Sequence, residues 1–290
     1  RIAEQTHLHH PRNLSIAGRL MPPIVHARWV ALILGSWALL FVAGVGAFIH
    51  LLSQRASARS SWQQMLAQRA AASPWRGRDL LPLALLIGAA QILRRWLAPP
   101  TLTWDLLAFH GIAFIAIIGL AALKPAPMGR PEQRRNIIPQ TVIRWLGILP
   151  LIWLGSFIWQ VTLRGIGRPP DLQMAVQLAL AIRDPWALAG FIMFSVTIVP
   201  FVEEIIFRGI LLSALVRRTG AWAGMLLTSL AFAALHADLG TFVALFIFAV
   251  ALNLAVARTG SLWVPIGMHM LFNAVNMALL LAVHHVGLLS

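Results

Sequence analysis

Eight long runs of apolar residues occupy most of this 290-residue chain and restrict how it can fold. A bilayer core about 30 Å thick is crossed by roughly 20 helical residues, at about 1.5 Å rise each. The runs have about this length, or are shorter where flanking arginine and tryptophan side chains can reach the headgroups. They are Trp29–Ile49, Leu80–Leu93, Leu106–Leu123, Trp145–Leu163, Trp186–Val202, Ala221–Leu235, Leu239–Ala257 and Ser261–Val283. Because the second, fifth and sixth runs are short, the sequence predicts seven to eight transmembrane helices.

The composition agrees with a membrane protein. Hydrophobic residues make up 59% of the chain and charged residues 11%, which excludes a soluble globular domain, a disordered chain and a collagen. The chain has no cysteine, which excludes disulfides, thiolate metal sites and cysteine nucleophiles. We therefore predict an all-α, polytopic integral membrane protein. The preference for arginine over lysine is typical of GC-rich bacterial genomes and favours a bacterial inner (plasma) membrane.

The net charge of +14 does not indicate nucleic acid as a partner. The basic residues lie between the apolar runs, where they anchor and orient membrane helices, and they form no dense basic tail. The odd-numbered loops between the runs carry thirteen Lys and Arg residues, against nine in the N-terminal tail and the even-numbered loops. This distribution favours the odd-numbered loops on the cytoplasmic side.

The chain divides into three predicted regions. Residues 1–28 form a polar tail, residues 29–184 a transmembrane region without a recognised motif, and residues 185–290 a catalytic transmembrane region. Within the second region, Leu172–Ile182 has the apolar spacing of a short interfacial helix. Asp105 and His110, near the start of the third run, are interpreted as an interfacial pair near the headgroups rather than as reacting groups.

Ionisable residues in the third region are the first indication of chemistry. Glu203, Glu204 and Arg208 lie in an otherwise uncharged apolar segment, where each charge costs about 2.5–3.5 kcal/mol on insertion scales. Glu204 and Arg208 have the i, i+4 spacing of a helical ion pair. Glu203 points about 100° away on the same helix and is left as a candidate general base. Pro200 predicts a kink just before the two glutamates.

Three further polar residues lie on the following apolar runs. His236 ends the sixth run, and His269 and Asn273 share one face of the last run at i, i+4 spacing. Taken singly, each could be an interfacial residue or form an interhelical hydrogen bond. Together with the glutamates, they place a base, two imidazoles and an amide donor on three apolar helices. This combination indicates an active site, which we predict in the C-terminal helical bundle.

The three motifs together resemble a known family. Glu203-Glu204-Ile205-Ile206-Phe207-Arg208, Phe232-xxx-His236 and His269-xxx-Asn273 are similar, in order, to EExxxR, FxxxH and HxxxN of the CAAX protease and bacteriocin-processing family. This family includes the type II CAAX prenyl endopeptidase. The resemblance covers about residues 185–276, and it implies an intramembrane endopeptidase that acts on a membrane-embedded or membrane-anchored protein or peptide.

The resemblance also implies roles for individual residues. Glu203 and His236 would activate a water molecule, and His269 and Asn273 would stabilise the oxyanion. Glu204 and Arg208 would have a structural or supporting role. Asn253 departs from the small residue that is expected at its position, so access of substrate to the site could differ.

The sequence leaves open whether a metal takes part. Glu203, His236 and His269 could form a zinc site with two histidines and one glutamate, with an open position for water. Asn273 would then need an outer role, and the histidines would need carboxylate or carbonyl partners. We favour a glutamate-dependent reaction without a cofactor, with zinc as the alternative.

Two other functions fit parts of the same pattern. Intramembrane Glu, His and Arg residues also occur in proton-coupled transporters, but the sequence shows no pair of repeated halves. The second alternative is a catalytically idle peptide-binding or bacteriocin-immunity membrane protein. Such a protein is expected to lack one or more motif residues, whereas all of them are present here.

Overall fold

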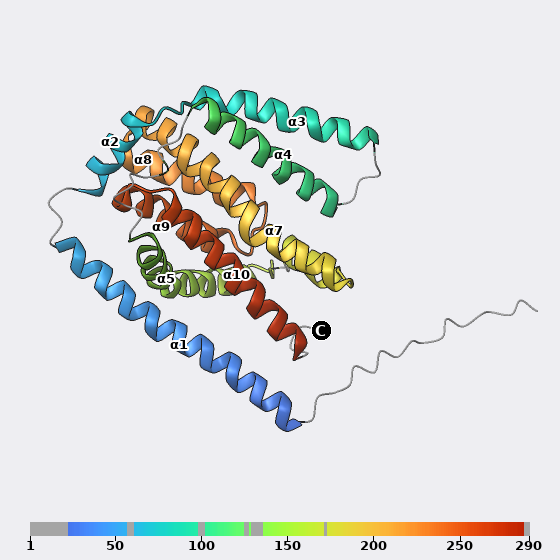
Figure 1. Ribbon diagram of the computed structural model, residues 1–290. Helices are drawn as coiled ribbons and strands as arrows, with labels where there is room; N and C mark the ends of the chain where they lie inside the picture. The colour runs from blue at the N-terminus through green and yellow to red at the C-terminus, as the bar shows by residue number, and fades with distance from the viewer. Residues whose placement is uncertain are drawn as a thin grey trace, which may run out of the picture.

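The computed structural model describes residues 23–56, 61–97, 102–124, 128, 136–170 and 173–286, and these residues form a helical bundle (Figure 1). Ten α-helices lie in the described part of the chain. They are α1 (Pro23–Ala56), α2 (Trp62–Ala72), α3 (Leu80–Leu97), α4 (Leu102–Leu123), α5 (Ile137–Gly165), α6 (Met174–Ala181), α7 (Pro185–Glu204), α8 (Leu212–Leu235), α9 (Phe242–Thr259) and α10 (Trp263–His285). A 3-10 turn, η1 (Gly77–Asp79), precedes α3, and a π-helical segment, η3 (Ile205–Leu211), joins α7 to α8.

The predicted all-α membrane architecture is confirmed, but the predicted number of spans is not. Each apolar run of the sequence lies in a helix. Five helical segments of the described chain are long and apolar enough to cross a membrane, namely Val25–Gln54, Ile137–Gly165, Pro185–Leu235, Phe242–Thr259 and Trp263–His285. The second and third runs form α3 and α4, and within α4 the segment His110–Leu120 is a shorter apolar helix.

The predicted fifth and sixth spans form one helical segment, Pro185–Leu235. Its backbone leaves helical geometry at Gly220, with φ 82° and ψ 171°. Such positive φ values favour glycine, so the chain turns at this residue between the two predicted spans. The helix α7 continues through Pro200 to Glu204, and irregular backbone follows as the π-helical segment η3.

The predicted polar tail and the predicted short helix at Leu172–Ile182 have different bounds in the structure. Helix α1 begins at Pro23, so the last six residues of the predicted polar tail are helical, and residues 1–22 lie outside the described chain. The run Leu172–Ile182 contains the short helix α6, Met174–Ala181, and its interfacial position stays a prediction.

Helix α1 lies along the outside of the bundle and packs on α5 (Figure 1). Glycines allow this close approach: a Cβ atom on Gly44 would lie 2.8 Å from the carbonyl oxygen of Leu146, and one on Gly147 would lie 2.8 Å from Leu51 Cδ1. Small residues at helix contacts are typical of membrane bundles, because they let backbones approach closely. Helix α1 thus covers the face of α5 that is turned away from the C-terminal helices.

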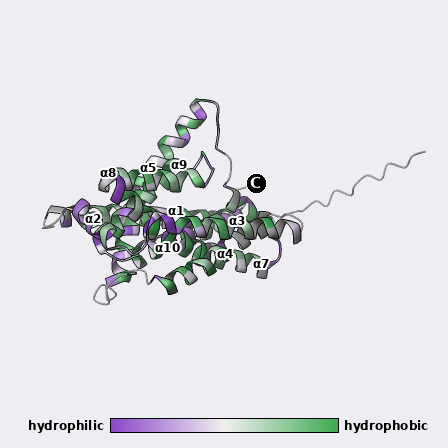
Figure 2. Cartoon of the chain, turned by 90° about the horizontal axis from the view of Figure 1, so that it is seen from above, coloured by the Kyte–Doolittle hydropathy of each residue, from purple (hydrophilic) through white to green (hydrophobic). Residues whose placement is uncertain are grey.

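The C-terminal helices hold the candidate residues. Helix α10 packs on α5, α7 and α9, and α9 also packs on α5 and α8. Apolar residues run along these helices, and hydrophilic residues gather where α2 lies beside α8 (Figure 2). A small apolar cluster of Phe207, Phe232, Ala233, Leu245 and Ala249 lies at the contact of η3, α8 and α9. Glu204, Arg208 and His269 are therefore buried among these helices, whereas His236 is exposed.

Candidate active site

The two glutamates end α7, directly before the π-helical segment. Glu204 is fully buried, and Arg208, within η3, is 1% exposed. The predicted ion pair is present, with 3.0 Å between Arg208 Nη1 and Glu204 Oε1. The guanidinium carbon also lies 4.5 Å from the ring centroid of Phe232, a distance that favours a cation–π contact. The arginine charge is thus compensated by a carboxylate and by an aromatic face.

Asn253 supplies the second polar anchor of this arginine. Arg208 Nε donates to Asn253 Oδ1 at 3.2 Å, and Arg208 Nη2 donates to the Ala249 carbonyl at 3.4 Å. The amide nitrogen of Asn253 in turn donates to Ser229 Oγ at 3.0 Å. Asn253 is itself fully buried. The sequence departure at this position therefore has a structural role: it ties α9 to Arg208 and to α8.

His269 connects the two glutamates. Its Nδ1 lies 2.8 Å from Glu204 Oε1, and its Nε2 lies 3.9 Å from Glu203 Oε2. Because an ionised carboxylate only accepts hydrogen bonds, Nδ1 must carry the proton that is shared with Glu204. The ring is 4% exposed and packs edge-on against Phe232 and Phe248. Glu204 therefore fixes the orientation of His269, with its second nitrogen toward Glu203.

His110 reaches the same glutamate from the N-terminal region. Its Nε2 lies 3.7 Å from Glu203 Oε1, and the residue is 9% exposed. Its ring also packs edge-on against Phe194 of α7. The interpretation of His110 as an interfacial residue near the headgroups was therefore wrong. The side chain of Asp105, its predicted partner, lies outside the described residues.

The carboxylate of Glu203 lies between His110 and His269. Its side chain is 17% exposed, but the Oε2 atom is buried and accepts no hydrogen bond from the described residues. A buried carboxylate oxygen requires a donor, which a water molecule or the N–H of a bound peptide can provide. The position of Glu203 fits a group that acts on such a molecule.

The two remaining candidates lie at the edge of this cluster. The Nδ1 atom of His236 lies 2.7 Å from the Phe232 carbonyl, which fixes its proton there and leaves Nε2 as an acceptor in the neutral ring. Asn273 Nδ2 donates to the Ser195 carbonyl of α7 at 2.9 Å, an interhelical bond that uses one of its two N–H groups. Within the described residues, neither side chain forms a hydrogen bond with Glu203.

A zinc ion in this site would need ligands that have outer partners of their own. His236 and His269 each have the carbonyl or carboxylate partner that metal-binding histidines use. However, no three His, Asp or Glu side chains of the described chain converge to hold a metal ion. The same outer bonds also suit histidines that act as acceptors or donors toward substrate. The geometry of the described residues therefore does not support the zinc alternative.

Comparison with known proteins agrees with these motifs. Residues 185–275 match the family described as type II CAAX prenyl endopeptidase Rce1-like. This segment is therefore similar to the CAAX protease family. It contains every motif residue discussed above, whereas His110 lies outside it. The match therefore covers α7, η3, α8, α9 and part of α10, and leaves the N-terminal helices without a family assignment.

A curated relative is similar to part of the chain. The Bacillus subtilis (strain 168) protein named "Putative membrane peptidase YdiL" is 32% identical over 109 residues. This alignment covers 38% of the chain and 43% of that relative, so it spans less than half of either protein. No solved structure matches the chain.

Proposed function

We propose that the chain is an intramembrane endopeptidase that hydrolyses a peptide bond of a membrane-embedded or membrane-anchored protein. The observation that carries the proposal is the carboxylate of Glu203, which lies between His110 and His269 and has one buried oxygen that accepts no hydrogen bond from the described residues. The similarity of residues 185–275 to the CAAX protease family supports it.

The reaction begins with water held by Glu203 and by Nε2 of His236. Glu203 takes a proton from this water while the water oxygen forms a bond with the carbonyl carbon of the substrate. The carbonyl oxygen becomes an oxyanion. The carbon–nitrogen bond then breaks, and the leaving amine takes the proton from Glu203. Water is consumed, and a carboxylic acid and an amine are formed; the acid then passes its proton to the amine, which leaves a carboxylate end and an ammonium end.

Two donors stabilise the oxyanion in this proposal. With Nδ1 of His269 bonded to Glu204, Nε2 is the ring nitrogen that faces the substrate, and it donates to the oxyanion when it carries a proton. Asn273 uses its second N–H group. Donors that are fixed in advance in a site of low dielectric favour the developing charge, because they need little reorientation during the reaction. Glu204 and Arg208 act by holding His269 in place.

The preferred substrate class is a bacterial peptide or anchor segment rather than a prenylated protein, because the composition favours a bacterial source. In the alternative function, an idle peptide-binding or bacteriocin-immunity protein, the same residues would bind a peptide without breaking it. A transporter would use the glutamates to carry protons. Only the proposed function generates new protein termini.

The test compares membrane protein termini in cells that carry the native chain, Glu203→Gln or Asp184→Asn. The first substitution keeps the shape of the side chain and removes the base. The second is the matched control: Asp184 is exposed, caps α7 at its far end, and can be replaced by asparagine, an equally good N-cap. We expect new termini with the native chain and Asp184→Asn, and none with Glu203→Gln. The same termini in all three samples would contradict the proposal.

A further inference from the structure

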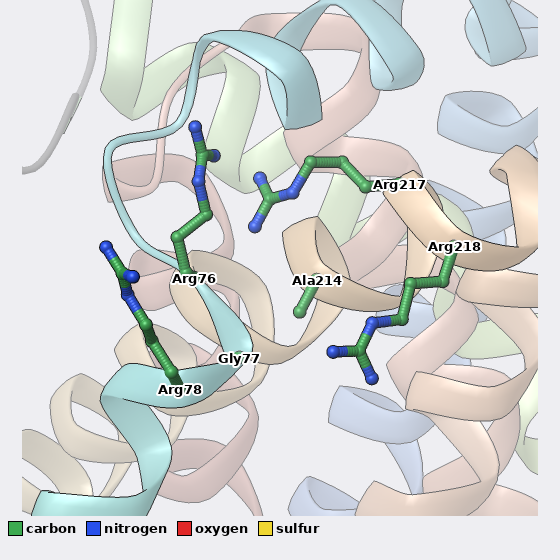
Figure 3. A pocket seen from close by; sticks show the side chains of 6 residues that line it. All are labelled: Arg76, Gly77, Arg78, Ala214, Arg217 and Arg218. Atoms are coloured by element: carbon green, nitrogen blue, oxygen red, sulfur yellow. The ribbon is translucent and has the colours of Figure 1, made fainter.

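Four arginines surround a cavity between the start of η1 and α8, and Glu203 does not line it. Arg76 and Arg78 flank Gly77 at the start of η1, and Arg217 and Arg218 lie on α8 beside Ala214. The cavity has a volume of about 310 Å³. Figure 3 shows Arg217 extending from α8 toward Arg76, with Arg78 and Arg218 on either side of the opening. We call this set of four residues the arginine pocket.

The backbone that carries Arg76 and Arg78 is held firmly. Trp75, directly before it, is 1% exposed, and its Nε1 donates to the Lys124 carbonyl at 3.1 Å. A Cβ atom on Gly209 would lie 2.3 Å from the Trp75 ring, so glycine is needed there for the tryptophan to seat against η3. Arg217 Nη2 donates to the Trp75 carbonyl at 2.8 Å and joins the two walls. The pocket is therefore formed before any ligand binds.

The charges of the pocket are not balanced within the described chain. Arg217 is repelled by both Arg76 and Arg218. Asp79 is the acidic residue next to the pocket and attracts Arg78, but its carboxylate accepts hydrogen bonds from Lys124 Nζ at 2.6 Å and from the Arg76 backbone N–H at 2.8 Å. No described carboxylate forms an ion pair with any of the four guanidinium groups. An anion in the cavity would relieve their mutual repulsion.

The location of the pocket identifies the source of such an anion. Trp62 of α2 and Trp222 of α8 pack edge-on at 4.7 Å between ring centroids, and Trp222 is 57% exposed. Exposed tryptophans gather at the level of the lipid headgroups. Trp222 lies four residues after Arg218, so the pocket opens close to this level. In the predicted numbering of the apolar runs, both walls of the pocket lie between runs in odd-numbered connections, which the charge distribution favours on the cytoplasmic side, where the leaflet carries anionic lipids.

We propose that the arginine pocket binds the phosphate group of an anionic phospholipid headgroup. Guanidinium groups present pairs of N–H donors that match the oxygens of a phosphate, and basic pockets between transmembrane helices on the cytoplasmic side bind anionic headgroups. The chemistry that is recognised is a phosphate, which a lipid or free inorganic phosphate could supply. The proposal does not depend on the peptidase function.

The test titrates phosphatidylglycerol and phosphatidylcholine onto the purified full chain in detergent and counts bound lipids by native mass spectrometry. The variant is the double substitution Arg78→Gln with Arg218→Gln. Both side chains are exposed, and within the described chain neither forms a hydrogen bond that holds the fold. The control is Arg164→Gln with Arg168→Gln, which removes two exposed arginines beyond the far end of the bundle.

One basic residue near an anionic surface contributes about fivefold in affinity, so loss of two predicts about 30-fold weaker binding of phosphatidylglycerol. Phosphatidylcholine binding and the control variant should be unchanged. If the double variant binds phosphatidylglycerol as the native chain does, the proposal is wrong. A second arm adds inorganic phosphate: displacement of the lipid at millimolar phosphate would identify a free-phosphate site and overturn the assignment to lipid.

Discussion

Replacing Arg208 by methionine tests the buried ion pair that fixes the site. The substitution keeps most of the side-chain volume but removes the charge opposite Glu204. Glu204 would then be a fully buried carboxylate with His269 Nδ1 as its remaining described partner, at 2.8 Å. Removing one partner of a buried ion pair leaves an uncompensated charge and typically costs about 3–5 kcal/mol. We expect Arg208→Met to lose that much free energy of unfolding.

The double variant Arg208→Met with Glu204→Gln separates charge from packing. A glutamine at this position can still accept the hydrogen bond from His269 and carries no charge. The remaining cost is that Asn253 Oδ1 loses its donor, Arg208 Nε, at 3.2 Å. An unsatisfied buried acceptor costs about 1–3 kcal/mol. The double variant should therefore be more stable than the single one by about 2 kcal/mol.

The assay is unfolding of the purified chain by a graded exchange of mild detergent for SDS, followed by far-UV circular dichroism. Arg164→Met, at an exposed position near the end of α5, is the control and should change the free energy of unfolding by less than about 0.5 kcal/mol. If Arg208→Met costs under about 1 kcal/mol, as an exposed pair would, the reasoning from burial is wrong.

Four further predictions test individual groups. His110→Ala should lower kcat for peptide cleavage about 10²-fold, because it removes a group that faces Glu203, and unchanged cleavage would remove His110 from the site. Asn273→Ala should lower kcat by about 10²–10³ if its amide meets the oxyanion, whereas an amide that only joins α10 to α7 would change stability alone. Excess 1,10-phenanthroline should leave cleavage unchanged; inhibition that zinc reverses would refute a reaction through water alone. Burial works to raise the pKa of Asp79, but hydrogen bonds from Lys124 and the Arg76 backbone outweigh it and lower that pKa. The resulting stability, about 1 kcal/mol, is complete above about pH 5 and is lost as pH falls through the lowered pKa. Asp79→Asn should remove this acid-dependent part of the unfolding free energy.

The helices of this chain could be predicted from the sequence, because the length and apolar character of each run depend only on neighbouring residues. The ion pair between Glu204 and Arg208 could be predicted for the same reason, since its partners lie within one helical turn. The turn at Gly220 and the π-helical segment could not, because their hydrogen bonds depend on how α7 and α8 pack. The number of spans remained undecided because the second, fifth and sixth apolar runs are short for a membrane span.

Contacts between distant helices were the main part that sequence reasoning missed. His110 belongs to a run without a motif, and its approach to Glu203 requires α4 to pack on α7. A histidine within an apolar run was the available signal, but the same residue fits a headgroup position equally well. The hydrogen bond from Arg208 to Asn253 likewise joins two residues that lie 45 positions apart in the chain. Local spacing carries no information on such contacts.

The central claim is that Glu203 activates water to break a peptide bond in the membrane. The most direct measurement reconstitutes the purified native chain or Glu203→Gln in liposomes with extracted bacterial membrane proteins, in water enriched in oxygen-18. Each hydrolysed bond leaves one heavy oxygen in the new C-terminal carboxylate. The account predicts labelled C-termini with the native chain and at least about 10²-fold fewer with Glu203→Gln. Equal labelling by both proteins would contradict the role of Glu203, and absence of label with the well-folded native chain would contradict hydrolysis itself.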